Sequence, residues 1–159
     1  MKRHDSPVTP ELLEAIRAQY RLDWGGVHGI GHWERVRAVG LALAAKTGAD
    51  PRLVELFAFL HDACRYNDQR DPGHGPRAAL LARALRGHCF ELRDGKFGLL
   101  CEALEAHTLG RLDARPDIAT CWDADRLDLG RVGIAPRKEL LSSAAAQEDA
   151  FFQWATQRP

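Results

Sequence analysis

The sequence predicts an all-α protein, a bundle of six to eight helices, and three observations support this. Apolar residues recur at helical spacing, as at Leu53, Leu56, Phe57 and Leu60. Helix-start signals are frequent: a Thr or Asp precedes a Pro at residues 9–10 and at residues 50–51. The strict apolar-polar alternation of strands is scarce.

Each expected helix has its own boundary signals. Thr9 and Asp50 are capping residues placed before a proline, Gly48 suits a helix end, and Ser142 or Ser143 caps the last helix. Residues 67–76, rich in Asp, Gly and Pro, are expected to form a loop, and residues 130–136 have room for a short extended piece. The expected helices span about residues 10–20, 32–48, 51–63, 77–86, 94–107, 117–129 and 143–157.

Length and composition favour a single cytoplasmic domain. The chain has 159 residues, which we divide into a helical lead-in (1–27), a motif-bearing core (28–135) and a C-terminal helix (136–159). Lys plus Arg and Asp plus Glu both number 22, which argues against bulk nucleic-acid or anionic-membrane binding. The sequence shows no secretory signal and no membrane-spanning apolar run, and its four cysteines, without a C-x-x-C pair, are expected to be reduced thiols.

Four helices place an imidazole or a carboxylate where the apolar row calls for a core residue. On the third helix the row through Leu53 and Phe57 continues to His61, which Asp62 follows. A lone inward histidine is usually a hydrogen-bonded core residue, but burying several such groups singly is costly, and a divalent cation among them removes that cost. We therefore expect a metal site centred on His61 and Asp62. The same reasoning predicts inward-facing groups on three other helices, namely His32, His107 and Asp125.

Two further motifs flank this His-Asp pair in order. Residues 32–36 read HWERV and resemble an H-x-x-R-V motif, and residues 122–128 read WDADRLD and resemble a D-A-D-R-L-D motif. Together they give the order H…HD…D, which resembles the HD-domain superfamily of metal-dependent phosphohydrolases over about residues 28–135. The resemblance implies that superfamily's helical bundle and metal-dependent hydrolysis of a phosphomonoester or phosphodiester. It also implies the metal ligands His32, His61, Asp62 and Asp125, with Asp123 as the competing choice for the last.

The resemblance also narrows the choice among branches of the HD-domain superfamily. Members such as the 5′-deoxynucleotidases and the guanosine-tetraphosphate hydrolases carry an acid a few residues after the HD pair, where this chain has Arg65 and Tyr66. The sequence is instead similar to the HD-x-x-R variants, and it lacks the G-Y-P motif of cyclic-di-GMP phosphodiesterases. The expected substrate is a nucleotide or another small phosphorylated metabolite of unspecified identity.

Several further residues are candidates for the site. In some proteins of the resembled superfamily two additional histidines hold a second metal, and His74 and His107 are compatible with that role. The alternative is that they contact substrate phosphate or orient the nucleophilic water. His28 is expected to have a supporting role, because glycines at 29 and 31 indicate that it precedes the helix. His4 and His88 lie in polar stretches and are left outside the site. Histidine and carboxylate ligands suit one or two ions of Mn, Fe, Co, Ni or Zn.

Further acidic and basic residues are expected to act as the proton acceptor and to bind phosphate. Asp62 or Asp68 would take a proton, and Arg65 and Arg77 would pair with phosphate oxygens. A supporting salt bridge is expected between Arg126 and Asp128. Three alternatives remain: a di-iron oxygenase of the HD type, a catalytically silent metal-binding regulatory module, and a purely structural metal site. The sequence gives no expectation of an oligomeric state.

Overall fold

The computed structural model describes residues 5–158, and within that range it is all-helical, without a strand. The predicted all-α bundle of six to eight helices is confirmed. An isolated bridge between Arg86 and Phe90 is the β-type pairing found there. The helices are α1 (Pro10–Gln19), α2 (Ile30–Thr47), α3 (Pro51–Leu60), α4 (His74–Leu85), α5 (Asp94–Ala106), α6 (Pro116–Arg126), α7 (Ala144–Gln147) and α8 (Asp149–Thr156), with the 3₁₀ turns η1 (Leu129–Val132) and η2 (Lys138–Leu140).

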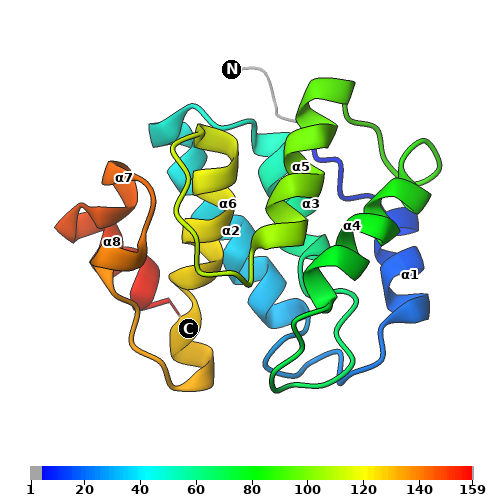
Figure 1. Ribbon diagram of the computed structural model, residues 1–159, viewed down its shortest axis with the longest axis horizontal. Helices are drawn as coiled ribbons and strands as arrows, with labels where there is room; N and C mark the ends of the chain where they lie inside the picture. The colour runs from blue at the N-terminus through cyan, green and yellow to red at the C-terminus, as the bar shows by residue number, and fades with distance from the viewer. Residues whose placement is uncertain (1–4, 159) are drawn as a thin grey trace.

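Four central helices form the framework. Helices α2, α3, α5 and α6 pack on one another, α4 packs on α5, and α7 packs on α8 and on α2. In Figure 1, α1 and α4 lie on one side of this framework and α7 and α8 lie on the other. The continuous core between them includes fully buried Trp33, Phe57, Leu100 and Ile118.

The helix starts follow local chemistry. The Thr9 hydroxyl accepts a hydrogen bond from the backbone N–H of Leu12, and the Asp50 carboxylate accepts one from the N–H of Arg52. Each cap precedes a proline at the first helical position, where a missing N–H costs nothing. Gly48 ends α2 with a φ of 80°, a conformation that favours glycine. These boundaries agree with the signals in the sequence.

Helix α3 ends at Leu60, three residues before its expected end. Two other helix boundaries, at the start of α4 and at the end of α6, also differ from expectation. The loop expected to extend to Pro76 ends earlier, because α4 begins at His74. Pro76 is the third residue of that helix, within the first turn, where backbone N–H groups have no intrahelical partner to lose. Helix α6 ends at Arg126 rather than near Leu129, which instead opens η1, so a 3₁₀ turn occupies the start of the segment considered for an extended piece.

The single C-terminal helix expected from the sequence is two helices. Helix α7 ends at Gln147, Glu148 is extended with a ψ of 131°, and α8 follows. The core explains the break, because Ala146 and Ala155 are both buried. In one straight helix, nine residues at about 100° per residue would place these two side chains on opposite faces.

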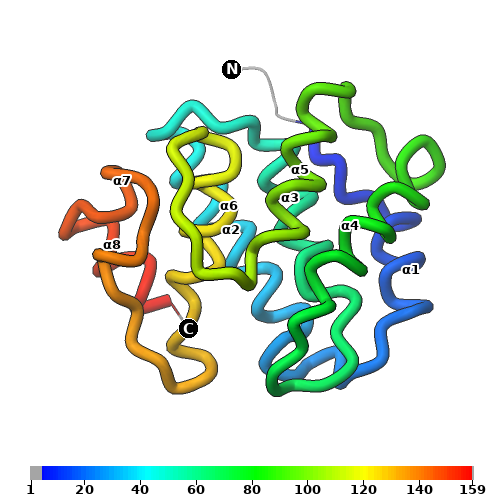
Figure 2. Tube along the Cα trace, in the orientation of Figure 1, coloured from blue at the N-terminus to red at the C-terminus, as the bar shows by residue number. Residues whose placement is uncertain are grey.

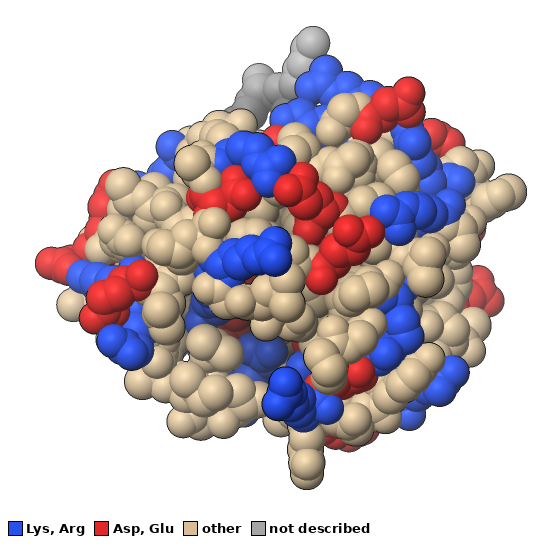
Figure 3. All heavy atoms as spheres, viewed as in Figure 1, with Lys and Arg blue, Asp and Glu red and all other residues tan. Residues whose placement is uncertain are grey.

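Three further findings concern the surface charges, the apolar character of the helices and the cysteines. On the face in Figure 3, basic and acidic side chains are interspersed. Among the described residues, no helix combines the length and the apolar character needed to cross a bilayer. All four cysteines lie in the described range and are free, with Cys101 and Cys121 buried in the core.

Candidate metal centre

The predicted site residues meet where several helix ends converge. His61 directly follows α3 and His107 directly follows α5, whereas His74 is the first residue of α4. His32 lies in the first turn of α2, and Asp125 lies in the last turn of α6. Figure 2 shows the segments before α2 and after α3 at the same edge of the molecule. The C-terminal ends of α3 and α5 carry partial negative charge, which favours a cation there.

A first cluster joins α2, α3 and α6. The Nε2 atoms of His32 and His61 are 2.9 Å apart. Oδ1 of Asp125 lies 3.2 Å from Nε2 of His32 and 3.4 Å from Nε2 of His61, and Oδ2 of Asp62 lies 3.5 and 3.6 Å from the same two atoms. Both histidines and Asp62 are buried, while the Asp125 side chain is 17% exposed. Two imidazoles and two carboxylates thus surround one small volume.

Asp123, the competing choice for the last ligand, faces away from this cluster. Its carboxylate accepts hydrogen bonds from the backbone N–H groups of Ser142 and Ser143 and from the Ser143 hydroxyl. Burial raises its pKa, and the hydrogen bonds from Ser142 and Ser143 oppose that rise. Asp123 therefore ties the start of the C-terminal region to α6, and Asp125 is the carboxylate of this motif that faces the Nε2 atoms of His32 and His61.

A second cluster lies beside the first and shares Asp62 with it. The Nε2 atoms of His74 and His107 are 2.9 Å apart. Oδ1 of Asp62 lies 3.0 Å from Nε2 of His74 and 3.7 Å from Nε2 of His107. Each oxygen of Asp62 therefore faces one histidine pair, an arrangement that suits a carboxylate bridging two ions.

All four histidines have the Nδ1 side of the ring engaged. Nδ1 of His32 lies 2.7 Å from the Asp128 carboxylate, and Nδ1 of His107 lies 2.7 Å from the carbonyl oxygen of Leu104. Nδ1 of His61 faces the carbonyls of Phe57 and Ala58, and Nδ1 of His74 faces that of Asp71.

Because these partners are acceptors, Nδ1 carries the proton and Nε2 keeps its lone pair in the neutral ring. In neutral rings two such lone pairs would face each other at 2.9 Å and repel, so each close pair needs either a proton or a metal cation between the two nitrogens. The buried His and Asp groups of both clusters lie within reach of one another and could hold a metal ion.

Two glycines allow the close approaches on which the clusters depend. A Cβ on Gly75 would lie 2.7 Å from the carbonyl oxygen of Leu104, so the first turn of α4 can rest on the end of α5 only with glycine here. That contact places His74 beside His107. A Cβ on Gly29 would lie 2.1 Å from the carbonyl oxygen of Trp24, in the tight turn that leads to His32.

Burial, neighbouring charges and hydrogen bonds shift the pKa values of Asp62, Asp125 and His61. Burial alone would raise the pKa of Asp62, but the charge of His61 and hydrogen bonds from His107 and His28 hold it well below its usual value. Burial likewise opposes ionisation of Asp125, yet the charge of His61 and a hydrogen bond from His32 lower its pKa strongly. Burial disfavours the charged form of His61, but the two carboxylates outweigh it and raise the pKa of His61. Both carboxylates are therefore ionised at neutral pH.

An open cleft of about 390 Å³ leads to both clusters, and several residues predicted to belong to the site line it. Asp62, Asp125, His74 and His107 line it, together with Arg65 and Asp68. Nε of Arg65 donates to Oδ1 of Asp62 over 3.3 Å. His28 connects two residues of the cleft lining: its Nδ1 lies 3.2 Å from Oδ2 of Asp62, and its Nε2 lies 3.1 Å from the carbonyl oxygen of Asp68.

Arg77, predicted to contact phosphate, lies outside the lining of this cleft. It donates to the carbonyl of Cys64 and to the carboxylate of Asp71, and its guanidinium stacks 3.6 Å over the Tyr66 ring. Asp71 in turn offers its carbonyl to Nδ1 of His74. The structure thus gives Arg77 a supporting position behind the loop that holds His74.

The salt bridge expected between Arg126 and Asp128 is not made. Arg126 donates to the carbonyls of Arg111 and Leu140, whereas Asp128 pairs with Arg35 and His32. Residues two apart near a helix end do not face each other, which explains the difference. Asp128 instead orients His32, and Arg35 holds Asp128 in place. Among the histidines left outside the site, His88 is exposed and His4 lies outside the described residues.

Arg131 is a site residue that the sequence reasoning missed. Its Nη2 lies 3.9 Å from both Oδ2 of Asp62 and Oδ1 of Asp125, and it lines the cleft. Nε donates to the carbonyl of Val27 and Nη1 to that of Asp128, which fixes the guanidinium. Arg131 belongs to the 3₁₀ turn η1, where no helical periodicity assigns a face. Its place shortly after the D-A-D-R-L-D motif was the available signal.

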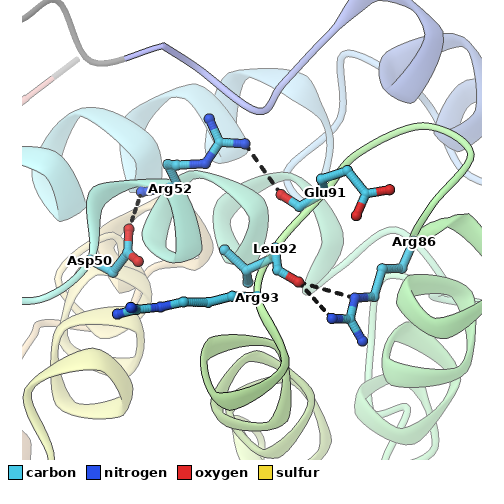
Figure 4. A pocket seen from close by; sticks show the side chains of 6 residues that line it. All are labelled: Asp50, Arg52, Arg86, Glu91, Leu92 and Arg93. Carbon is cyan, nitrogen blue, oxygen red and sulfur yellow. Dashed lines mark hydrogen bonds between the residues drawn. The ribbon is translucent and has the colours of Figure 1, made fainter.

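A larger hollow of about 480 Å³ lies elsewhere and offers different chemistry (Figure 4). It opens at the start of α3, about 15 Å along that helix from His61, since ten residues rise about 1.5 Å each. Its six lining residues include no histidine or cysteine. Arg52 donates to the carbonyl of Glu91, and Arg86 donates to that of Leu92. These arginines fasten the segment before α5, so we place the functional site in the cleft.

Comparison of the chain with protein-family models, with curated proteins and with solved structures finds no match. The geometry of the clusters and the motifs in the sequence are therefore the guides to the function of this chain.

Metal binding is expected to stabilise the fold in a pH-dependent way. At about 100 times its Kd, Mn²⁺ should add about 2.7 kcal/mol, because it binds the folded chain alone. For a chain of this size that raises Tm by about 5–10 °C. Protons compete for Nε2 of His61, whose pKa is raised above 6.5, so the Mn²⁺-induced shift should be larger at about pH 8 than at about pH 6. Thermal unfolding with Mn²⁺ or with a chelator measures this, and equal shifts at both pH values would contradict it.

Proposed function

We propose that this chain is a metal-dependent phosphohydrolase of the HD-domain type that acts on a small phosphorylated metabolite. The observation that supports this best is the convergence of four imidazole Nε2 atoms on the two oxygens of Asp62. This nitrogen and oxygen ligand set suits Mn, Fe, Co, Ni or Zn. The open cleft beside it leaves room for a substrate, unlike a closed structural site.

The residues that would hold the metal divide into two sets. His32, His61 and Asp125 would hold one ion, His74 and His107 would hold a second, and Asp62 would serve both. A bound divalent ion supplies a Lewis acid for the phosphorus centre and a water of lowered pKa. The chain itself orients the imidazoles through their Nδ1 partners, which fixes each Nε2 before any substrate arrives.

Two arginines at the cleft would receive the phosphate. Arg131 and Arg65 approach Asp62 from different segments, and both guanidiniums are held by backbone carbonyls. A guanidinium fixed in this way offers its remaining N–H groups to phosphate oxygens at little entropic cost. The arginines would also balance the charge of a phosphoryl group brought near two carboxylates.

Asp68 is the better candidate for the proton acceptor. Asp62 is buried, its two oxygens face the histidine pairs, and its pKa lies well below the usual range, so it is a weak base. Asp68 is exposed at the rim of the cleft, and His28 holds its backbone carbonyl in place.

The proposed function is tested by metal analysis followed by a phosphate-release screen. The purified protein is loaded with Mn²⁺, Co²⁺, Ni²⁺ or Mg²⁺ and assayed on nucleotides and simple phosphoesters, with chelator-treated protein as the control. We expect a bound transition metal and phosphate release that stops on metal removal. Activity that survives full metal removal would refute the proposal. Bound metal without any turnover would favour the silent regulatory module.

A di-iron oxygenase is the second candidate, because a carboxylate shared between two histidine pairs also suits two iron ions. The two candidates differ in their need for oxygen. Phosphate release should proceed under anaerobic conditions, whereas oxygenase chemistry should consume oxygen in the presence of iron. An oxygen electrode with iron-loaded protein and candidate substrates separates the two.

Arg131 provides a specific prediction for the hydrolase. Arg131→Ala should lower kcat/KM for phosphate release by about 10- to 100-fold, the value of a lost hydrogen bond to a charged group. Arg131→Lys should recover only part of this, because an ammonium lacks the bidentate fork. Arg83→Ala, which removes an exposed arginine on α4, is the matched control and should leave the kinetics unchanged. Unchanged kinetics in both Arg131 variants would remove this residue from phosphate binding.

A further inference from the structure

An apolar groove adjoins the cleft. It has a volume of about 240 Å³ and lies between the loop after α5, the end of α6 and the segment that follows η1. The groove and the cleft share three lining residues, so they are neighbours on one surface. The groove is lined mainly by Gly110, Arg126, Leu129, Ile134, Arg137 and Leu140.

The shared residues leave a path between the two hollows. Gly110 presents no side chain, and its φ of +69° suits glycine. Leu129 provides an apolar surface at the junction. Arg126 is anchored to the carbonyls of Arg111 and Leu140, so it forms a fixed wall rather than a movable plug. A molecule bound at the metal clusters could therefore extend along this wall into the groove.

Exposed apolar side chains gather around this path. Ile134 is 54% exposed and Leu140 is 50% exposed, and both line the groove. Val132, at the cleft, is also exposed. Large apolar residues left open to water beside a polar site indicate a surface that is covered when a ligand binds.

We propose that the substrate is amphiphilic, with its phosphorylated group at the metal clusters and an apolar group in this groove. The inference rests on the proposed function, which places the phosphoryl group in the cleft. The groove alone is smaller than the about 300–1,000 Å³ typical of small-molecule sites, so it suits one part of a substrate rather than a whole molecule. Arg126 and Arg137 also line the groove, and their positive charge favours the anionic head of such a molecule nearby.

The proposal is tested with alkylphosphonates, whose carbon-phosphorus bond resists hydrolysis. Binding of ethyl-, butyl- and hexylphosphonate to the Mn²⁺-loaded protein is measured by calorimetry. Burial of each added methylene should tighten binding by up to about three- to fourfold. We therefore expect hexylphosphonate to bind at least about tenfold more tightly than ethylphosphonate. A Kd independent of chain length would overturn the proposal.

Variants locate the effect in the groove. Leu140→Ala and Ile134→Ala should each reduce the gain from ethyl to hexyl and leave ethylphosphonate binding unchanged. Leu80→Ala removes a leucine on α4 that is 63% exposed, more than either groove residue, and should change neither value. Equal weakening by Leu80→Ala would overturn the assignment to the groove.

The outcomes keep the two proposals apart. Phosphate release from simple phosphoesters without a chain-length effect on binding would refute the groove and leave the proposed function standing. Chain-length-dependent binding without any hydrolysis would refute the proposed function and leave the groove standing. Failure of all three phosphonates to bind would overturn the groove proposal, and the phosphate-release screen would then decide the function separately.

Discussion

Asp62→Asn is expected to abolish metal binding at both clusters and to reduce phosphate release by about 10³-fold or more, equivalent to about 4 kcal/mol. The reason is the position of Asp62: Oδ2 faces His32 and His61, and Oδ1 faces His74 and His107. An amide of the same shape cannot supply a negative oxygen to both pairs. Metal content and phosphate release under saturating Mn²⁺ measure the loss.

A matched variant separates loss of ligation from loss of structure. Asp123→Asn removes another buried carboxylate, two residues from Asp125, whose partners are Ser142 and Ser143. It should lower Tm through weaker hydrogen bonds while retaining metal. Circular dichroism confirms that both variants remain helical. Full metal content in Asp62→Asn would contradict the bridging role of Asp62. Loss of metal in Asp123→Asn would show that the last motif ligates through Asp123 instead of Asp125.

His107→Ala is expected to change the metal content from two ions per chain to one. Nε2 of His107 belongs to the second cluster, 2.9 Å from Nε2 of His74, whereas the first cluster keeps both of its histidines and Asp125. Loss of one ion of a two-metal site should slow phosphate release by about 10²-fold. Metal analysis after gel filtration, together with kcat and KM, tests this.

Two further variants test whether the His74 and His107 pair holds a second metal ion. His74→Ala removes the other member of the pair and should give the same result as His107→Ala. His88→Ala removes an exposed histidine outside both clusters and should keep both ions and full activity. If the unmodified protein binds one ion and His107→Ala raises KM without changing metal content, the pair contacts substrate phosphate rather than a second metal.

The helical pattern predicted which of several imidazole and carboxylate groups turn inward, because these groups follow the period of the helix on which, or directly after which, they lie. His61 continues the row of Leu53 and Phe57, and Asp125 lies on the face of α6 that approaches Nε2 of His32 and of His61. Local capping chemistry at Thr9 and Asp50 likewise set the helix starts. Such signals lie within a few residues of chain, so they are readable without the fold.

Other features depend on contacts between distant segments. The sequence could not show that Gly75 rests on the carbonyls at the end of α5, which brings His74 to His107. Arg131 reaches the cleft from a 3₁₀ turn that has no periodic face. The break between α7 and α8 follows from two alanines that must both face the core. Each of these is decided by packing.

By itself the sequence determined the all-α class and several of the imidazole and carboxylate groups that turn inward, because helical periodicity records which face of each helix is buried. The tertiary structure alone decided how these groups meet. It joined two histidine pairs through the two oxygens of Asp62, turned Asp123 and Arg77 away from the cleft, and brought Arg131 to its rim. The physical reason is that distances between helices are set by the close packing of whole faces, which no local pattern encodes.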